Sequence, residues 1–199
     1  MTASRRGGRR PGDSGTRTAI LQAARSSFGT AGYAGTTIRG IARTAGVDPA
    51  LVHHFFGNKD GLFAAALELP FDPSTVVAGL LAEGLEGLGE RVVRTFLGIW
   101  DATPGQGPML ALLRSAVSDE APASTLRDFL TRAVLTPLVE AAGSRDDAEL
   151  RAALAASQML GIAVTRYVVR LEPVASAPAD VLAPAVGGTL DRYLTGPGV

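Results

Sequence analysis

Apolar residues recur along the chain at spacings of three and four positions, and no stretch of useful length alternates apolar with polar residues. The first spacing gathers apolar side chains on one side of a helix, whereas alternation is typical of a strand. Alanine, the residue with the highest helix propensity, is frequent throughout. The pattern therefore predicts an all-α fold.

The amino-terminal segment contains the signals of a helix start and a helix end. Residues 1–15 are rich in Arg, Gly and Ser, which predicts a flexible basic arm. Thr16 or Thr18 can then cap a first helix. Gly32 stands where a residue of left-handed conformation commonly ends a helix.

Two shorter helices are expected next. Thr36 or Thr37 can cap one that ends at Gly46, and Asp48 can cap another. Pro49 follows in the first turn, where the missing N–H of proline costs nothing. Two short helices joined by a glycine-bearing turn form a helix-turn-helix. Because this unit is too small to bury its own apolar faces, the first helix and a fourth one must support it.

The rest of the chain, residues 68–199, is predicted to form a helical bundle. Segments such as TPGQGP and GSRDD separate its helices, because they are rich in residues that favour turns. The expected helices span residues 75–84, 88–102, 107–118, 121–142, 146–171 and 178–194.

Charge divides the chain into a basic head and an acidic body. Residues 1–66 carry nine basic and three acidic side chains, a net charge of +6, so the remaining 133 residues carry −6 in a chain of net charge 0. A basic head favours a polyanionic partner such as nucleic acid. A solvated basic tail with no partner is the alternative reading of charge alone.

Several classes of protein are disfavoured by composition. The chain has no cysteine, which excludes disulfides, thiolate metal sites and thiol nucleophiles. Its longest uncharged apolar segment, Ala152–Thr165, has 14 residues, fewer than the roughly 20 of a membrane span. The start MTASRRGGRR lacks the apolar stretch of a signal peptide. We therefore expect a cytoplasmic protein without a membrane partner.

Three segments occur in order and with ungapped spacing between Thr18 and Leu67: ILQAARSSFGTAGYAGTT, the turn IARTAGVDPALVHHFF and the helix entry NKDGLF. In these segments the chain resembles the TetR family of bacterial transcription regulators. The resemblance implies a three-helix helix-turn-helix DNA-binding domain at residues 16–67. It further implies that residues 68–199 form a helical domain for ligand binding and dimerisation.

The same resemblance implies a set of DNA contacts. They are Thr36, Thr37, Arg39, Asp48, Pro49, Ala50, Leu51, His53, His54 and Lys59. Arginine suits guanine O6 and N7, and a lysine at a helix start suits a phosphate. The alternatives are a solvated arginine and threonines that only cap a helix.

The only histidines of the chain, His53 and His54, are adjacent. Neighbours on a helix point about 100° apart, whereas metal-binding pairs usually stand four residues apart and have further ligands nearby. No interpretable nucleophile accompanies them either. We therefore expect no metal site, no catalytic residue and no cofactor, and we interpret both histidines as surface residues of a recognition helix.

The two last predicted helices, 146–171 and 178–194, are the candidate dimer interface, because the first of them has little polar surface. A purely intramolecular core is the alternative. A ligand cavity is expected between bundle helices, although such residues also form ordinary cores. Its candidate lining is Phe96, Trp100, Met109, Leu113, Arg114, Phe129, Gln158, Met159 and Tyr167.

The sequence thus predicts a homodimeric, sequence-specific DNA-binding regulator, a repressor that responds to a small-molecule effector and recognises a near-palindromic operator in double-stranded DNA. The alternatives are an architectural DNA-binding protein without a ligand and an all-helical enzyme. The second would need converging titratable groups, which the pattern does not offer.

Overall fold

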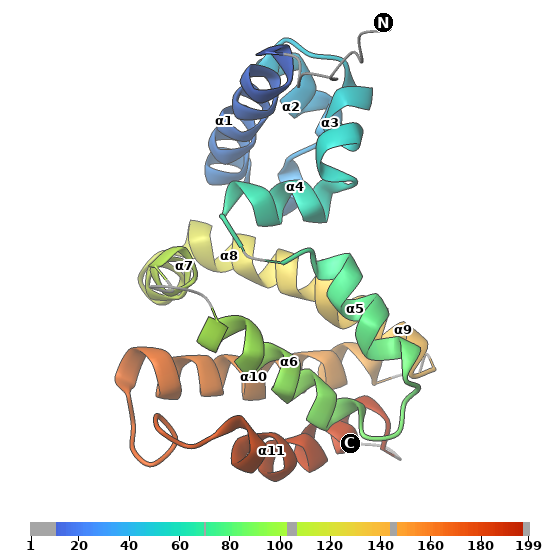
Figure 1. Cartoon of the computed structure of the whole chain (residues 1–199), viewed down its shortest axis with the longest axis vertical. Coiled ribbons are helices and arrows are strands. Elements are labelled where there is room, and N and C mark those ends of the chain that lie inside the picture. Colours follow the sequence, from blue (N-terminus) through green and yellow to red (C-terminus); the bar gives the residue numbers. More distant parts are fainter. Residues whose placement is uncertain (1–10, 70, 103–106, 144–146, 197–199) are drawn as a thin grey trace, which may run out of the picture.

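The computed structural model describes residues 11–69, 71–102, 107–143 and 147–196, and these residues form helices and connections without a strand. Figure 1 shows two parts stacked along the long axis of the molecule, with α1 to α4 at one end and α5 to α11 at the other. The predicted all-α class is confirmed.

The amino-terminal part contains four helices. They are α1 (Pro11–Gly35), α2 (Ile38–Ala45), α3 (Pro49–Phe56) and α4 (Lys59–Ala66). Helix α1 begins inside the predicted flexible arm, because proline has the fixed φ of a first helical turn. The rest of that arm, residues 1–10, lies outside the described residues. Gly32 interrupts α1 with a φ of 68° and a ψ of −179°, an extended backbone at positive φ that glycine can adopt, instead of the left-handed helical conformation expected there.

Side chains cap the three short helices at the positions where the sequence places a cap. Thr37 Oγ1 accepts a hydrogen bond from Gly40 N, and Asp48 Oδ1 accepts one from Ala50 N. Asn58 does the same for α4. Each cap satisfies a backbone N–H that has no partner inside its helix, so these helix starts are fixed locally.

The carboxy-terminal part is a bundle of longer helices. They are α5 (Pro73–Ala82), α6 (Leu88–Ala102), α7 (Gly107–Ser118), α8 (Glu120–Phe129), η1 (Leu130–Leu135), α9 (Thr136–Ala141), α10 (Ala148–Ala163), η2 (Val164–Val169) and α11 (Ala179–Leu194). Segments η1 and η2 are π-helical. The predicted helices 121–142 and 146–171 are therefore continuous runs that each contain a π-helical segment.

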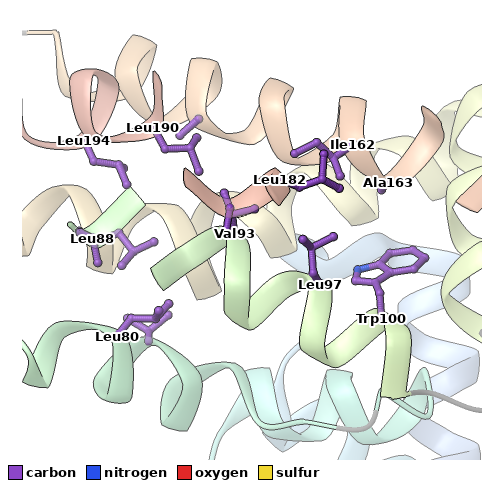
Figure 2. Packing of buried hydrophobic residues seen from close by; sticks show 14 of the residues in the cluster. Leu80, Leu88, Val93, Leu97, Trp100, Ile162, Ala163, Leu182, Leu190 and Leu194 are labelled. Carbon is purple, nitrogen blue, oxygen red and sulfur yellow. The ribbon is translucent and has the colours of Figure 1, made fainter. Parts of the chain in front are cut away.

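The bundle core lies mainly between α6 and α11 (Figure 2). Its fully buried leucines and valine from these helices are Leu88, Val93, Leu97 and Leu190. The two backbones approach so closely that a Cβ added to Gly187 would stand 2.6 Å from the Cα of Glu90. Close packing of this kind fixes the relative position of two helices, because no side chain can yield.

Polar side chains fasten this helix pair at the end where α6 begins and α11 ends. Asp191 of α11 accepts a hydrogen bond of 2.6 Å from Gly89 N and so caps the start of α6. Arg151 is buried, with 2 % of its surface exposed, and donates to the carbonyls of Tyr193 and Gly196 where α11 ends. Its Nε forms an ion pair of 2.8 Å with Asp147. The cation stabilises the negative end of α11.

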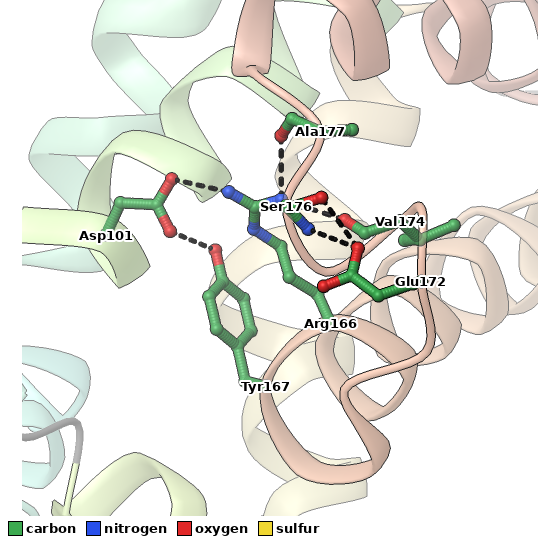
Figure 3. A network of polar contacts seen from close by, with 7 residues as sticks. All are labelled: Asp101, Arg166, Tyr167, Glu172, Val174, Ser176 and Ala177. Atoms are coloured by element: carbon green, nitrogen blue, oxygen red, sulfur yellow. Dashed lines mark hydrogen bonds and ion pairs between the residues drawn. The ribbon is translucent and has the colours of Figure 1, made fainter.

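A second arginine holds the connection that leads into α11 (Figure 3). Arg166 donates to the carbonyls of Val174 and Ala177 at 2.9 and 2.8 Å. It also reaches Asp101 at the end of α6, at 3.2 Å, and Asp101 accepts a hydrogen bond from Tyr167. Burial, with this hydrogen bond, raises the pKa of the Tyr167 phenol. The network joins α6, η2 and the loop before α11.

An aromatic cluster joins the two parts of the molecule. Phe129 of α8 is buried, and its ring centroid lies 4.7 Å from that of Phe63 and 6.1 Å from that of Tyr33. Phe28 packs edge-on to Phe63 at 4.9 Å. The core of the amino-terminal part is therefore completed by a side chain of the carboxy-terminal part.

Tyr33 also has a polar partner at this junction. Its hydroxyl donates to the Asp60 carboxylate, and the ammonium of Lys59 stands 4.3 Å from the centroid of its ring. Burial, together with the hydrogen bond to Asp60, raises the pKa of the phenol well above its ordinary value of 10.0.

Among the described residues, one helical run, Ala148–Val169, is long and apolar enough to cross a membrane by length and composition. Charged residues such as Arg151 and Arg166 interrupt this run, so the length of uncharged segments does not identify it. In the structure this run contains the buried Arg151 and packs against α11 and η1, and 28 % of its apolar window is buried inside the molecule.

We predict that Gly187→Ala destabilises the protein by about 1–3 kcal/mol or more, because the new Cβ overlaps the backbone of Glu90. Gly188→Ala is the matched control, since nothing lies within 4 Å of its added Cβ, and it should stabilise the helix by up to about 1 kcal/mol. Urea unfolding followed by circular dichroism measures both. Equal effects of the two substitutions would contradict the close α6–α11 contact.

We also predict a loss of stability at alkaline pH that depends on Tyr33. Its folded-state pKa is raised, so the stabilisation is full below pH 10.0 and falls as the pH rises above that value, where the unfolded phenol ionises first. Between pH 9 and 11, Tyr33→Phe should lose about 1 kcal/mol less free energy of unfolding than the unsubstituted protein. Denaturant titrations at the two pH values test this, and identical losses in both proteins would refute it.

Candidate nucleic-acid interface

Helices α2 and α3 form a helix-turn-helix. Gly46 ends α2 with a φ of 68° and a ψ of 33°, a left-handed conformation that glycine adopts without a steric penalty. Its N–H donates to the carbonyl of Arg43, and that of Val47 donates to Ala42. These bonds satisfy the last carbonyls of α2 and set the direction in which α3 leaves the turn.

One side of α3 is buried and the other is open. Val52 and Phe56 are buried in the amino-terminal core, whereas Ala50, His53 and His54 are exposed. Of the adjacent phenylalanines, Phe56 faces inward and Phe55 is half-buried. A short helix with one side held in a core and one side free can present its outer residues to a groove of DNA.

Most of the predicted contact residues lie on the open surface of this unit. Exposed are Thr37, Arg39, Asp48, Ala50, Leu51, His53 and His54, whereas Pro49 and Lys59 are half-buried. Thr36 differs, because it is buried and its hydroxyl donates to the carbonyls of Gly32 and Ser27. The side chain of Thr36 therefore stabilises the contact with α1, whereas the hydroxyl of Thr37 stays at the surface.

Hydrogen bonding orients one of the two histidine rings. His53 Nδ1 lies 2.8 Å from the carbonyl oxygen of Gly57, which can only accept, so Nδ1 carries a proton. The other nitrogen, Nε2, then accepts a hydrogen bond when the ring is neutral and donates only when the ring is protonated. The ring of His54 packs edge-on to Phe55 at 5.2 Å. No group of three or more potential metal ligands occurs among the residues that the structure describes.

Two arginines stand on α2 four residues apart. Arg39 and Arg43 are both exposed, and neither forms an ion pair within the described ranges. Residues four apart share one side of a helix. Arg43 also borders a polar cavity of about 410 Å³ between α1 and α2, which threonine and serine side chains line. Arg43 is not among the contacts that the resemblance implies, although its spacing of four residues from Arg39 is a usable signal in the sequence.

Lys59 turns toward the junction with the carboxy-terminal part. Its ammonium stands over the ring of Tyr33, and burial, followed by the nearby charge of Arg132, lowers its pKa. To bind a phosphate, this side chain would leave the aromatic ring.

The carboxy-terminal part contains a groove of about 950 Å³ between α7, the run α8–η1–α9, and α10. Its lining is mostly aliphatic and includes Leu126, Leu130, Leu135, Ala152, Ala156 and Leu160. Of the candidate pocket residues, Leu113 lines this groove. Trp100 stacks on Tyr167 at 4.8 Å and packs against Phe96, and Phe129 lies in the junction cluster.

The remaining pocket candidates are dispersed. Arg114 is exposed on α7, and Gln158 and Met159 are half-buried on α10. The side chain of Met109 lies outside the described residues.

The expected dimer helices, α10 with η2 and α11, divide their apolar residues between core and surface. Leu182, Leu190 and Leu194 are buried against α6, so these three belong to the intramolecular core. Leu150 and Val181 are 56 % and 57 % exposed. These helices therefore leave large apolar side chains exposed, Leu150 near the start of α10 and Val181 near the start of α11.

Comparison with known proteins matches both parts of the chain to domain families. Residues 20–66 match the family described as bacterial regulatory proteins, tetR family. Residues 86–194 match the family described as tetracyclin repressor-like, C-terminal domain.

Similar proteins carry names of the same kind. The HTH-type transcriptional regulator BetI of Rhizobium meliloti is 47 % identical over 51 residues, 26 % of this chain and 25 % of that protein. The HTH-type transcriptional repressor AcnR of Corynebacterium jeikeium is 35 % identical over 96 residues, 48 % of this chain and 47 % of that protein. This chain thus spans a quarter to a half of the length of these curated relatives.

A crystal structure of a TetR-family regulator from Streptomyces coelicolor A3 is 41 % identical and covers 95 % of this chain and 99 % of its own, with a TM-score of 0.48. The C-terminal family model alone matches more than half of the present chain, residues 86–194 of 199. The chain belongs to the TetR family of bacterial regulatory proteins.

Proposed function

We propose that this protein is a sequence-specific DNA-binding regulator of transcription that acts in the bacterial cytoplasm as a repressor. The observation that carries the proposal is the helix-turn-helix itself. Its second helix, α3, is anchored by the buried Val52 and Phe56. The same helix leaves Ala50, His53 and His54 exposed to solvent. The family of the chain and the names of its relatives support the same function.

The surface around α3 suggests how the contacts are divided. Arg39 and Arg43 supply positive charge along α2, and a guanidinium can bind guanine O6 and N7 in two parallel hydrogen bonds. Thr37 stands at the start of α2, where a hydroxyl and backbone N–H groups can hold a phosphate. His53 Nε2 donates to a phosphate when the ring is protonated, and when neutral it accepts from a base amino group.

A dimer gives this short helix enough surface for specific binding. One eight-residue recognition helix contacts few base pairs, whereas two of them about 34 Å apart reach successive major grooves of a near-palindromic site. The apolar residues exposed on the outer side of α10 and α11, Leu150 and Val181, support an interface there.

An architectural DNA-binding protein is the second candidate, because the positive charge of the basic head, residues 1–66, would be enough for binding without sequence preference. It binds all duplexes alike, whereas a regulator prefers its operator by about a thousandfold or more. Selection from a library of random duplexes identifies the preferred sequence, and titration against a scrambled duplex at several salt concentrations separates the two functions. Equal affinity for both duplexes would exclude the regulator.

We predict that Arg39→Ala lowers affinity for the selected duplex by about 10- to 100-fold and changes affinity for the scrambled duplex less, because a base contact is lost. Lys59→Ala should weaken both complexes alike, as expected of a phosphate contact. Arg114→Ala removes an exposed arginine of α7 and serves as the control. If the preference for the selected sequence survives Arg39→Ala, this arginine does not read bases.

We further predict that Val181→Glu converts the dimer to a monomer in sedimentation equilibrium, because it places a charge in the proposed interface. Affinity for the palindromic duplex should fall in parallel. Val117→Glu on α7 is the matched control, since this valine is 81 % exposed and lies in the groove rather than on α11. Dissociation caused by Val117→Glu alone would place the interface at the groove instead.

A further inference from the structure

The groove between α7, α8–η1–α9 and α10 has an aliphatic body, and no aromatic side chain is found among the described residues that line it. Leucine, valine and alanine cover most of it. At about 950 Å³ it lies within the usual range of small-molecule sites. An aliphatic molecule would therefore be held by burial of apolar surface rather than by ring stacking.

Charge is distributed unevenly along this groove. Among the described residues, one basic residue lines it, Arg127, which forms an ion pair of 3.3 Å with Glu120. Glu140 near the end of α9 and Glu149 in the first turn of α10 also line it. Both carboxylates are exposed, and neither forms an ion pair within the part of the chain that the structure describes.

These two glutamates stand at the same end of the groove, because α9 ends at Ala141 and α10 begins at Ala148. A positive group placed there meets two negative charges, and an anion meets repulsion from both. The positive charge of Arg127 already pairs with the carboxylate of Glu120.

The wall of the groove is also the wall of the junction with the DNA-binding part. On α8 and η1, Leu126 and Leu130 line the groove, whereas Phe129 and Ala133 are buried in the core of the amino-terminal part. A molecule that displaces the first pair moves the second pair, since all four belong to one continuous helical run. The π-helical turn η1 occurs in this run, and such turns accompany local irregularity at functional sites.

We propose that this groove binds an amphipathic cation, with an aliphatic body along α8, η1 and α10 and its positive group between Glu140 and Glu149. Occupancy shifts α8–η1 and, through Phe129, changes how the amino-terminal part is held. The binding step is independent of the proposed function, whereas its effect on DNA rests on that function.

A matched pair of probes tests the sign of the charge. Decyltrimethylammonium and decyl sulfate carry the same ten-carbon chain with opposite heads, and isothermal titration calorimetry below their micelle concentrations measures both. We expect the cation to bind at least about tenfold more tightly than the anion, a difference of about 1.4 kcal/mol. Equal affinities, or tighter binding of the anion, would overturn the assignment.

Substitution of the two carboxylates locates the head group. The double variant Glu140→Gln, Glu149→Gln should weaken cation binding by about 5- to 10-fold, because both charges are lost while side-chain volume is kept. Glu83→Gln with Glu86→Gln, two exposed carboxylates between α5 and α6, is the control and should change nothing. If both double variants bound the cation more weakly by a similar factor, the effect would come from the net charge of the protein and not from a site at Glu140 and Glu149.

A third variant locates the aliphatic body. Ala156→Phe places a ring in the middle of the α10 wall and should abolish binding of the cation. Its circular dichroism and urea unfolding are compared with those of the unsubstituted protein. If the variant folds and binds the cation unchanged, the probe occupies another site and the proposal fails. Dissociation of a dimer by Ala156→Phe would show a second copy as the occupant and would also overturn it.

The effect on DNA is measured separately. With the selected duplex, saturating decyltrimethylammonium should change affinity severalfold, and the glutamine double variant should require a correspondingly higher concentration. Cation binding without any DNA binding would refute the proposed function and leave the site standing. DNA binding without cation binding would refute the proposed site and leave the proposed function standing.

Discussion

The aromatic contact between Phe129 and the amino-terminal part is the constraint on which the rest of the structure depends. A helix-turn-helix with one supporting helix on each side has too few residues to enclose its own core. Here the opening is closed by Phe129, which packs against Phe63 and Tyr33, and by Ala133. The position of α3 at the surface is therefore set by α8 as well as by the turn at Gly46.

This arrangement gives the run α8–η1 two roles at once. One side of it completes the core of the DNA-binding part, and the other forms a wall of the aliphatic groove. A displacement of α8–η1 from the groove side would also displace the aromatic rings of the junction, because these rings are closely packed and have little room to move. Lys59 and Asp60 extend the same junction to the start of α4, through the ring and hydroxyl of Tyr33.

In the carboxy-terminal part, the contact between α6 and α11 fixes the relative position of these two helices. Helices α6 and α11 meet at Gly89 and Gly187, where an added Cβ has no space. Asp191 caps α6, and the buried Arg151 closes the end of α11. These contacts hold the inner side of α11, whereas Val181 of the same helix stays exposed, where the proposed dimer interface lies.

Local chemistry determined much of this fold from the sequence alone. Caps such as Thr37 and Asp48 act on backbone groups two or three residues away, so helix starts in the head could be predicted, as could the glycine turn. Spacing also indicated the exposed side of α3. The open rim at Glu140 and Glu149 was not predicted, since it depends on how α9 and α10 are placed.

Tertiary packing alone decided which apolar side chains form cavities and which fill cores. Phe129 and Trp100 look alike in the sequence as candidates for a pocket, yet one completes the junction and the other stacks on Tyr167. Their partners lie tens of residues away, and helical periodicity identifies the buried side of a helix without identifying what covers it.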